Sequence, residues 1–274
     1  MKLKYIIAAS FVLAHIQCHV MLSSVEALFT AIEEGNQEEI EEQIQAGVDV
    51  NAPATRRELG SITALMYAAK QNKIDIVRTL LAYGANPNII TQEGYTALGY
   101  ACTSRSLDII QVLLRSGANP DIRQEGGWTP LMSVAHFSHQ GTDEILIAQA
   151  LIQAGADVNA VDQFQRTALE AAIYQEALDM IDLLLSSGAH CNVRNHRDQT
   201  VLQVAFHCFH RTKNTRFIKI ALKLLTYGAI YSPEDQIWVE RDVLREQKYR
   251  IIRAELVRMY EEHAGRAESD YIFK

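Results

Sequence analysis

A unit of about 33 residues recurs along most of this chain and limits what it can fold into. One copy spans Gly94 to Asp121 and reads GYTALGYACTSRSLDIIQVLLRSGANPD. A leucine near the start of each copy and a glycine near its end recur together, at Leu65, Leu98, Leu131, Leu169 and Leu202 and at Gly47, Gly84, Gly117, Gly155, Gly188 and Gly228. Because the leucine and the glycine recur together at nearly the same spacing, we predict a solenoid in which each unit is stabilised by its neighbours.

Each copy is predicted to contain two helices. Small residues such as Ala101 and Ala172 keep the first helix slim, and aliphatic residues at helical spacing, such as Leu80 and Leu81, give the second helix a buried face. The glycine then suits the left-handed residue that ends a helix. Extra residues fall in a loop at 53–60 and at the junctions near 138–142 and 210–216, where we expect them to leave the helices intact.

These segments resemble the ankyrin repeat, whose hallmark is Thr-Pro-Leu-His-x-Ala. The matching segments are GYTALGYA, GWTPLMSVA and QRTALEAA, each followed by a helix that ends in a Gly-Ala pair. The resemblance covers residues 23–229, about six repeats, and implies an all-α helical solenoid with short β-hairpin fingers. The hallmark histidine is replaced throughout, so its inter-repeat hydrogen bonds are not carried over; the replacements are Met66, Gly99, Met132, Glu170 and Gln203.

Residues 1–22 differ in kind from the repeats. Lys2 and Lys4 precede an uncharged apolar run from Tyr5 to Ile16, a pattern typical of a secretory signal peptide. The run is shorter than the roughly 20 residues that a helix needs to span a membrane. The alternative to a signal peptide is a buried N-terminal helix. Ser23 and Glu26 have capping-box spacing, which places the start of the repeat domain at residue 23. We therefore expect a chain exported through a signal peptide, secreted or periplasmic.

Residues 230–274 leave the repeat pattern. Ser232, Pro233 and the acids that follow are typical of a helix start, and Ile237, Leu244 and Ile251 form one apolar stripe. We expect a helix that caps the open end of the stack. The alternative is a docking helix, which would make the protein a structural or inhibitory subunit of its partner.

Neither the composition nor the motifs favour catalysis or nucleic-acid binding. The net charge of -7 argues against a phosphate-binding protein, and neither a phosphate loop nor an H-E-x-x-H or G-x-S-x-G motif occurs. We predict no enzyme activity, cofactor or metal. A zinc site among the histidines and cysteines of 190–210 is the weaker alternative, because their spacing matches no zinc motif. Cys102, Cys191 and Cys208 are expected to be buried thiols.

The basic run from His210 to Lys223 contains no acid and has two interpretations. It is a solvated surface, or it contacts an acidic partner.

The ankyrin resemblance implies a partner-binding surface on the concave face, made of the fingers and the ends of the first helices. We therefore predict a monomeric module that binds a protein partner and, once its signal is removed, neither nucleic acid nor membrane. Aromatic anchors such as Tyr95, Trp128 and Phe164 are expected to contribute most of the binding energy. The alternative is that they pack against their own fingers. The candidate residues are Gln92, Glu93, Tyr95, Thr103, Ser104, Glu125, Trp128, His136, Phe137, Gln163, Phe164, Arg166, Tyr174, Gln175, His196 and Arg197.

Overall fold

The computed structural model describes residues 24–54, 61–138, 142–230 and Arg258. The described residues fall into two compact units, the first running to Pro130 and including 153–156, the second comprising the rest. The expected signal segment, Ser23 of the capping box and, apart from Ile230 and Arg258, the expected C-terminal helix lie outside the described residues.

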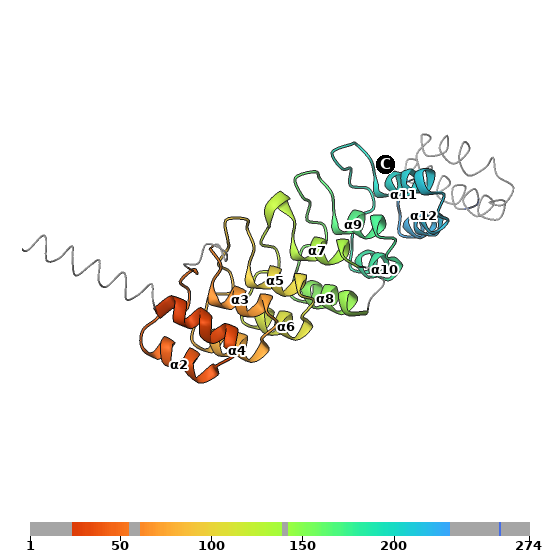
Figure 1. Ribbon diagram of the computed structural model, residues 1–274. Coiled ribbons are helices and arrows are strands. Elements are labelled where there is room, and N and C mark those ends of the chain that lie inside the picture. Colours follow the sequence, from red (N-terminus) through yellow and green to blue (C-terminus); the bar gives the residue numbers. More distant parts are fainter. Residues whose placement is uncertain (1–23, 55–60, 139–141, 231–257, 259–274) are drawn as a thin grey trace, which may run out of the picture. The chain divides into compact units, whose positions relative to one another are not determined.

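Paired helices make up both units (Figure 1). The first unit contains a helix at 24–34, α2 (Gln37–Gln45), α3 (Ala64–Lys70), α4 (Ile74–Ala82), α5 (Ala97–Thr103), α6 (Leu107–Arg115) and the 3-10 turn η1 (Glu125–Gly127). The second begins within α7 (Pro130–His136) and contains most of α8 (Thr142–Gln153), then α9 (Ala168–Tyr174), α10 (Leu178–Ser186), α11 (Val201–Thr212) and α12 (Arg216–Thr226). These described helices form six pairs, which confirms the predicted all-α solenoid of about six repeats.

Local sequence fixes where the helices begin and end. The hydroxyl oxygens of Thr63, Thr96, Thr167 and Thr200 accept hydrogen bonds from backbone N–H groups three residues on, and so cap α3, α5, α9 and α11. At the end of α6, Gly117 has a φ of +84°, and the N–H of Ala118 donates to the carbonyl of Leu113 at 3.0 Å. This Schellman geometry explains why a glycine ends each second helix.

The first and second helices of each repeat contribute different side chains to the core, as the repeat pattern predicts. Ala101, Ala172 and Ala205 in the first helices are completely buried. Their small side chains allow α3 to pack on α5 and α9 on α11. Ile110 and Leu113 on α6 are also fully buried and supply the bulk of the apolar contact.

The extra residues near 210–216 leave α11 unbroken, as expected, but they lengthen it where only a longer junction was expected. Helix α11 is 12 residues long, whereas α9 has seven, and it ends only at Lys213, whose φ is +56°. Continuing the helix gives the backbone N–H and C=O groups of the extra residues hydrogen-bond partners. It also buries Phe209. In the first unit, the loop at 53–60 begins with an antiparallel bridge between Pro53 and Thr63, and residues 55–60 lie outside the description.

A ladder of asparagine side chains joins successive repeats within each unit. Asn88 donates through Nδ2 to the carbonyl of Gly117 at 2.9 Å and accepts at Oδ1 from the N–H of Asn119 at 2.7 Å. The same two bonds recur from Asn159 and Asn192, and Asn51 accepts from the N–H of Asn86 at 2.8 Å. We call Asn51, Asn88, Asn159 and Asn192 the asparagine ladder.

Candidate functional site

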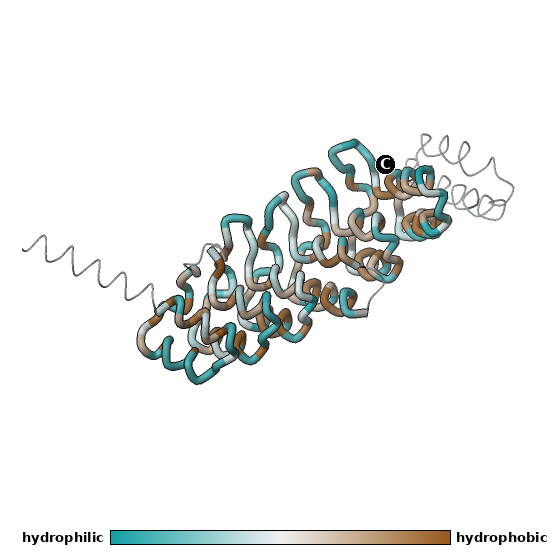
Figure 2. The backbone as a smooth tube through the Cα atoms, viewed as in Figure 1, coloured by the Kyte–Doolittle hydropathy of each residue, from teal (hydrophilic) through white to brown (hydrophobic). Residues whose placement is uncertain are grey.

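Four finger loops share one turn. In each, the N–H of the first residue donates to the carbonyl of the fifth at 2.8–3.0 Å, in Thr91–Tyr95, Gln124–Trp128, Asp162–Arg166 and Asn195–Gln199. The fourth residue has a positive φ in every finger, although it is glycine only at Gly94 and Gly127. Figure 2 shows these loops as mostly hydrophilic, whereas the helices carry apolar stretches. The fingers therefore hold polar and aromatic side chains in a fixed geometry.

Neighbouring fingers are in direct contact within each unit. In the first unit, the N–H of Glu125 donates to the carbonyl of Glu93 at 2.8 Å. A Cβ atom at Gly94 would lie only 2.7 Å from the carbonyl oxygen of Arg123, so the close approach itself requires glycine there. In the second unit, the N–H of His196 donates to the carbonyl of Phe164 at 2.9 Å. Backbone bonds thus hold the fingers in pairs.

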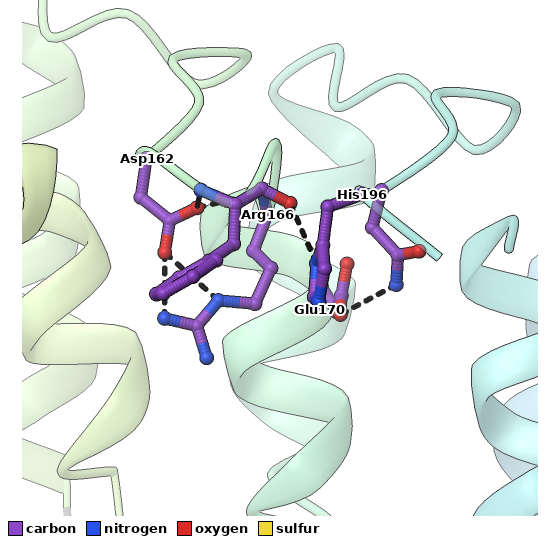
Figure 3. Close-up of polar contacts among 6 residues, drawn as sticks. Asp162, Arg166, Glu170 and His196 are labelled. Carbon is purple, nitrogen blue, oxygen red and sulfur yellow. Dashed lines mark hydrogen bonds and ion pairs between the residues drawn. The ribbon is translucent and has the colours of Figure 1, made fainter. Parts of the chain in front are cut away.

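Asp162 organises the finger of the fifth repeat, which leads into α9 (Figure 3). Its side chain is 1% exposed, and Oδ1 accepts from the backbone N–H groups of Phe164 at 2.8 Å and Arg166 at 2.9 Å. Its Oδ2 forms an ion pair with the Arg166 guanidinium, 2.6 Å from Nη2 and 2.8 Å from Nε. The guanidinium carbon lies 5.0 Å from the centre of the Phe164 ring. A buried carboxylate therefore fixes both the turn and an arginine stacked on an exposed aromatic ring.

His196 extends this arrangement from the next finger. Its ring centre lies 5.2 Å from that of Phe164, and its Nδ1 is 3.1 Å from the Phe164 carbonyl oxygen (Figure 3). Because a carbonyl oxygen can only accept, Nδ1 carries the proton in this hydrogen bond. We call Asp162, Phe164, Arg166, Glu170, Asn195 and His196 the finger cluster.

Glu170 lies at the base of the finger cluster and is 3% exposed. Its Oε1 accepts from Nδ2 of Asn195 at 3.0 Å, while Oδ1 of Asn195 accepts from the N–H groups of Arg197 and Gln199. Burial raises the pKa of the Glu170 carboxyl, and the Asn195 hydrogen bond and the Arg166 charge offset part of that rise. Glu170 occupies the position of the hallmark histidine, so an inter-repeat hydrogen bond persists there with different chemistry.

Gly99 occupies the same position in the first unit and accommodates a different contact. A Cβ atom there would lie 2.6 Å from Nε2 of Gln124, so the amide of the next finger fills the space that a side chain would need. Sequence reasoning missed both inter-repeat contacts. The only available signal was the pairing of an unusual residue at this position with a polar first residue in the following finger.

None of the 16 candidate residues is buried. Gln92, Glu93, Thr103, Glu125, Phe137, Gln163, Phe164, Tyr174, His196 and Arg197 are exposed, and Tyr95, Ser104, Trp128, His136, Arg166 and Gln175 are half-buried. The two hydroxyl groups are used within the fold: Thr103 donates to the carbonyl of Gly99 in α5, and the Ser104 hydroxyl is shared between the carbonyls of Tyr100 in α5 and Lys70 in α3.

The expected aromatic belt is divided between the two units. Tyr95 stacks on Tyr100 of its own repeat, with ring centres 5.3 Å apart, so it is partly committed to internal packing. Trp128 also belongs to the first unit. In the second unit, Phe137, Phe164 and Tyr174 are 49%, 41% and 43% exposed. The strongest aromatic candidates therefore lie in the second unit.

His207 and Arg211, both on α11, were not among the candidates for the partner-binding surface. Partial burial lowers the pKa of the His207 imidazole, and the charges of Arg211, His210 and Arg197 lower it further. Burial raises the pKa of the Tyr174 hydroxyl, a rise partly offset by Arg197 and Arg166. His207 and Arg211 are four residues apart on α11, so they lie on the same face of that helix. The length of the insertion at 210–216 was the signal, because the extended α11 carries Arg211.

The histidine and cysteine run shows no metal-binding geometry within the described part of the chain. No group of three His, Cys, Asp or Glu residues that could hold a metal ion occurs there. Cys102, Cys191 and Cys208 are buried free thiols, and burial raises the pKa of Cys208 to about 11 and of Cys102 to about 12. None of the helices searched among these residues is both long and apolar enough to cross a membrane.

Comparison with known proteins gives one family and two partial relatives. The family profile for ankyrin repeats in three copies matches residues 28–124 and 109–195. A protein of Fowlpox virus (strain NVSL), named as an ankyrin repeat protein, is 43% identical over 63 residues, 23% of this chain and 9% of its own length. A protein of Danio rerio, named as a palmitoyltransferase, is 27% identical over 146 residues, 52% of this chain and 22% of its own length. The similarity therefore covers only a small part of either relative.

Proposed function

Because this chain belongs to the ankyrin repeat family, we propose that it is a non-catalytic module that binds another protein through its finger tips and first-helix ends. The observation that supports this function best is the finger cluster. Phe164 is 41% exposed, yet Asp162 and the finger turn fix its backbone and hold Arg166 against its ring.

Such preorganisation favours binding. Aromatic and arginine side chains dominate the energies of protein interfaces, and a partner need not offset the entropy of ordering side chains that are already held. Tyr174 on α9 contributes a second exposed ring in the same unit. Phe164 and Tyr174 are therefore expected to act as anchors.

Capture of partners by the immobilised full-length chain tests the proposal. The variant Phe164→Ala plus Tyr174→Ala is expected to lose affinity for the captured partner by about 30-fold or more, since anchor residues contribute about 1–2 kcal/mol each. Tyr83→Ala plus Tyr227→Ala is the matched control, because these aromatic residues are equally exposed but follow second helices. Unchanged capture by the first variant, with native circular dichroism, would refute the proposed surface.

We also propose that residues 1–22 direct export of the chain. The support is the pair of lysines followed by a short apolar run. N-terminal sequencing of the protein recovered outside producing cells is expected to find a chain that starts after this segment. Recovery of the intact chain inside the cells alone would contradict export.

A further inference from the structure

Positive charge is concentrated in one part of an acidic protein. Residues 191–223 contain seven lysines and arginines and a single acid, Asp198, whereas the whole chain has a net charge of -7. The segment includes the finger Asn195–Gln199, α11 and most of α12. The concentration therefore belongs to the second unit, which also carries the finger cluster.

Three of these cations are used within the fold. Arg194 pairs with Asp198 at 3.3 Å, Arg216 lies 3.9 Å from Glu176, and Lys223 pairs with Asp182. The last two pairs join α12 to the fifth repeat, so part of the basic run has a structural role. Lys213 lies over the ring of Phe209, 5.7 Å from its centre.

Arg197 and Arg211 are different, because both are exposed and no ion pair to either occurs among the described residues. His207 and Arg211 are four residues apart on α11 and so lie on the same face of that helix. Burial lowers the pKa of His207, and the charges of Arg211 and Arg197 lower it further. Burial raises the pKa of Tyr174, and the charges of Arg197 and Arg166 offset part of that rise. We call Arg166, Tyr174, Arg197, His207 and Arg211 the basic surface. It is contiguous with Phe164 through the stacking of Arg166 on that ring.

Two acids that adjoin the basic surface, Asp162 and Glu170, are buried, whereas Asp198, next to Arg197, is exposed and pairs with Arg194. Asp162 is 1% exposed in its side chain and is paired with Arg166. Glu170 is 3% exposed and accepts a hydrogen bond from Asn195. The exposed groups of this surface are therefore mainly guanidinium groups and aromatic rings, and the exposed carboxylate of Asp198 is paired with Arg194.

We propose that the basic surface binds an acidic segment of the partner protein, in which carboxylates alternate with large apolar side chains. This inference rests on the proposed function, which it deepens by naming the class of partner. Guanidinium groups recognise carboxylates through paired hydrogen bonds, while Phe164 and Tyr174 offer contact area to apolar side chains. The acidic remainder of the chain repels the same segment, which favours its binding here.

Synthetic peptides provide a direct probe. One fluorescein-labelled peptide of about 12 residues alternates Glu with Leu and Phe, and its counterpart has Lys at every Glu position. Fluorescence anisotropy with the full-length protein is expected to show at least about tenfold tighter binding of the Glu peptide. Its affinity is expected to fall when NaCl is raised from about 50 mM to about 300 mM, because salt screens exposed charges.

Charge reversal locates the binding surface. Arg197→Glu plus Arg211→Glu is expected to weaken binding of the Glu peptide about tenfold, since two attractions become repulsions. Arg78→Glu plus Arg115→Glu is the matched control, because it makes the same change in net charge at exposed arginines of the first unit. This control is expected to change the affinity no more than about twofold.

Four results would overturn the inference: equal binding of the two peptides, equal effects of the two reversals, tighter binding of a single-stranded oligonucleotide of equal charge, or salt-sensitive self-association that the reversal at Arg197 and Arg211 abolishes. The proposed protein-binding function is tested separately, by the capture experiment. If the captured partner is lost in Phe164→Ala plus Tyr174→Ala but not in the charge reversal, the binding function stands and the acidic partner does not. If neither variant affects capture, both proposals fail.

Discussion

The variant Asn195→Asp tests the arrangement of the finger cluster. In the native protein, Oδ1 of Asn195 accepts from the N–H groups of Arg197 at 2.9 Å and Gln199 at 3.1 Å, and Nδ2 donates to Glu170 at 3.0 Å. An aspartate retains the acceptor for both N–H groups. It replaces the N–H donor with a second carboxylate oxygen, which faces the carboxylate of Glu170, a residue that is only 3% exposed.

The expected cost follows from the separation. Two like charges about 4 Å apart repel by about 4 kcal/mol at an effective dielectric of about 20, and uptake of one proton relieves part of that repulsion. We therefore expect Asn195→Asp to lower the free energy of unfolding by about 2–4 kcal/mol near pH 8. A carboxyl whose pKa is raised on folding stabilises the fold fully below its unfolded pKa of about 4.3 and loses that contribution as pH rises through the raised value. The loss should therefore shrink to about 1 kcal/mol or less near pH 4.5.

Urea denaturation followed by circular dichroism at both pH values measures these free energies. The same substitution in a Glu170→Gln background is the control, because an uncharged partner removes the repulsion and should reduce the cost to about 1 kcal/mol or less at either pH. A loss that is equal at both pH values and in both backgrounds would refute the reasoning, since it would mean that Glu170 and residue 195 do not interact as charges.

Other parts of the structure give further predictions, each checked by the free energy of unfolding. Glu170→Gln alone is expected to raise stability at pH 7 and to flatten its increase on acidification towards pH 4.5, because burial raises the pKa of that carboxyl; an unchanged pH profile would contradict this. Gly94→Ala should cost about 2 kcal/mol or more through backbone strain and the clash with the next finger, whereas Gly84→Ala, with a similar φ but open space, should cost only the strain of about 1 kcal/mol. Asn88→Ala removes two ladder bonds and should cost about 1–3 kcal/mol; a loss below about 0.3 kcal/mol would show that water replaces them. Leu113→Ala should cost about 2–5 kcal/mol, because this side chain is fully buried on α6.

The sequence predicted the repeat architecture because its markers are set by local geometry. Thr96 caps α5 through its own hydroxyl, and Gly117 ends α6 in a left-handed conformation that other residues rarely adopt. Such requirements involve only a few neighbouring residues, so the sequence shows them directly. They recur at a constant period and therefore also indicate how the units stack.

The finger cluster was predicted only as separate residues. Phe164, Arg166 and His196 were expected to be accessible, but their mutual stacking depends on side-chain directions that residue type does not determine. The bond between Glu170 and Asn195 joins residues 25 positions apart. A pattern within one repeat contains no information about such contacts. The extension of α11 was missed for a related reason, because a short insertion is equally compatible with a loop and with additional helical turns.

The asparagine ladder has a consequence for how proteins of this kind change length over generations. Asn51 bonds to the N–H of Asn86, and Asn88 bonds in the same way to the N–H of Asn119. If recombination removed the 33 residues from Asn86 to Ala118, a length taken from the repeat period, Asn51 would meet Asn119 and could form the same bond. A gene of this type can therefore lose a whole copy while the asparagine bond between the repeats that become neighbours is retained.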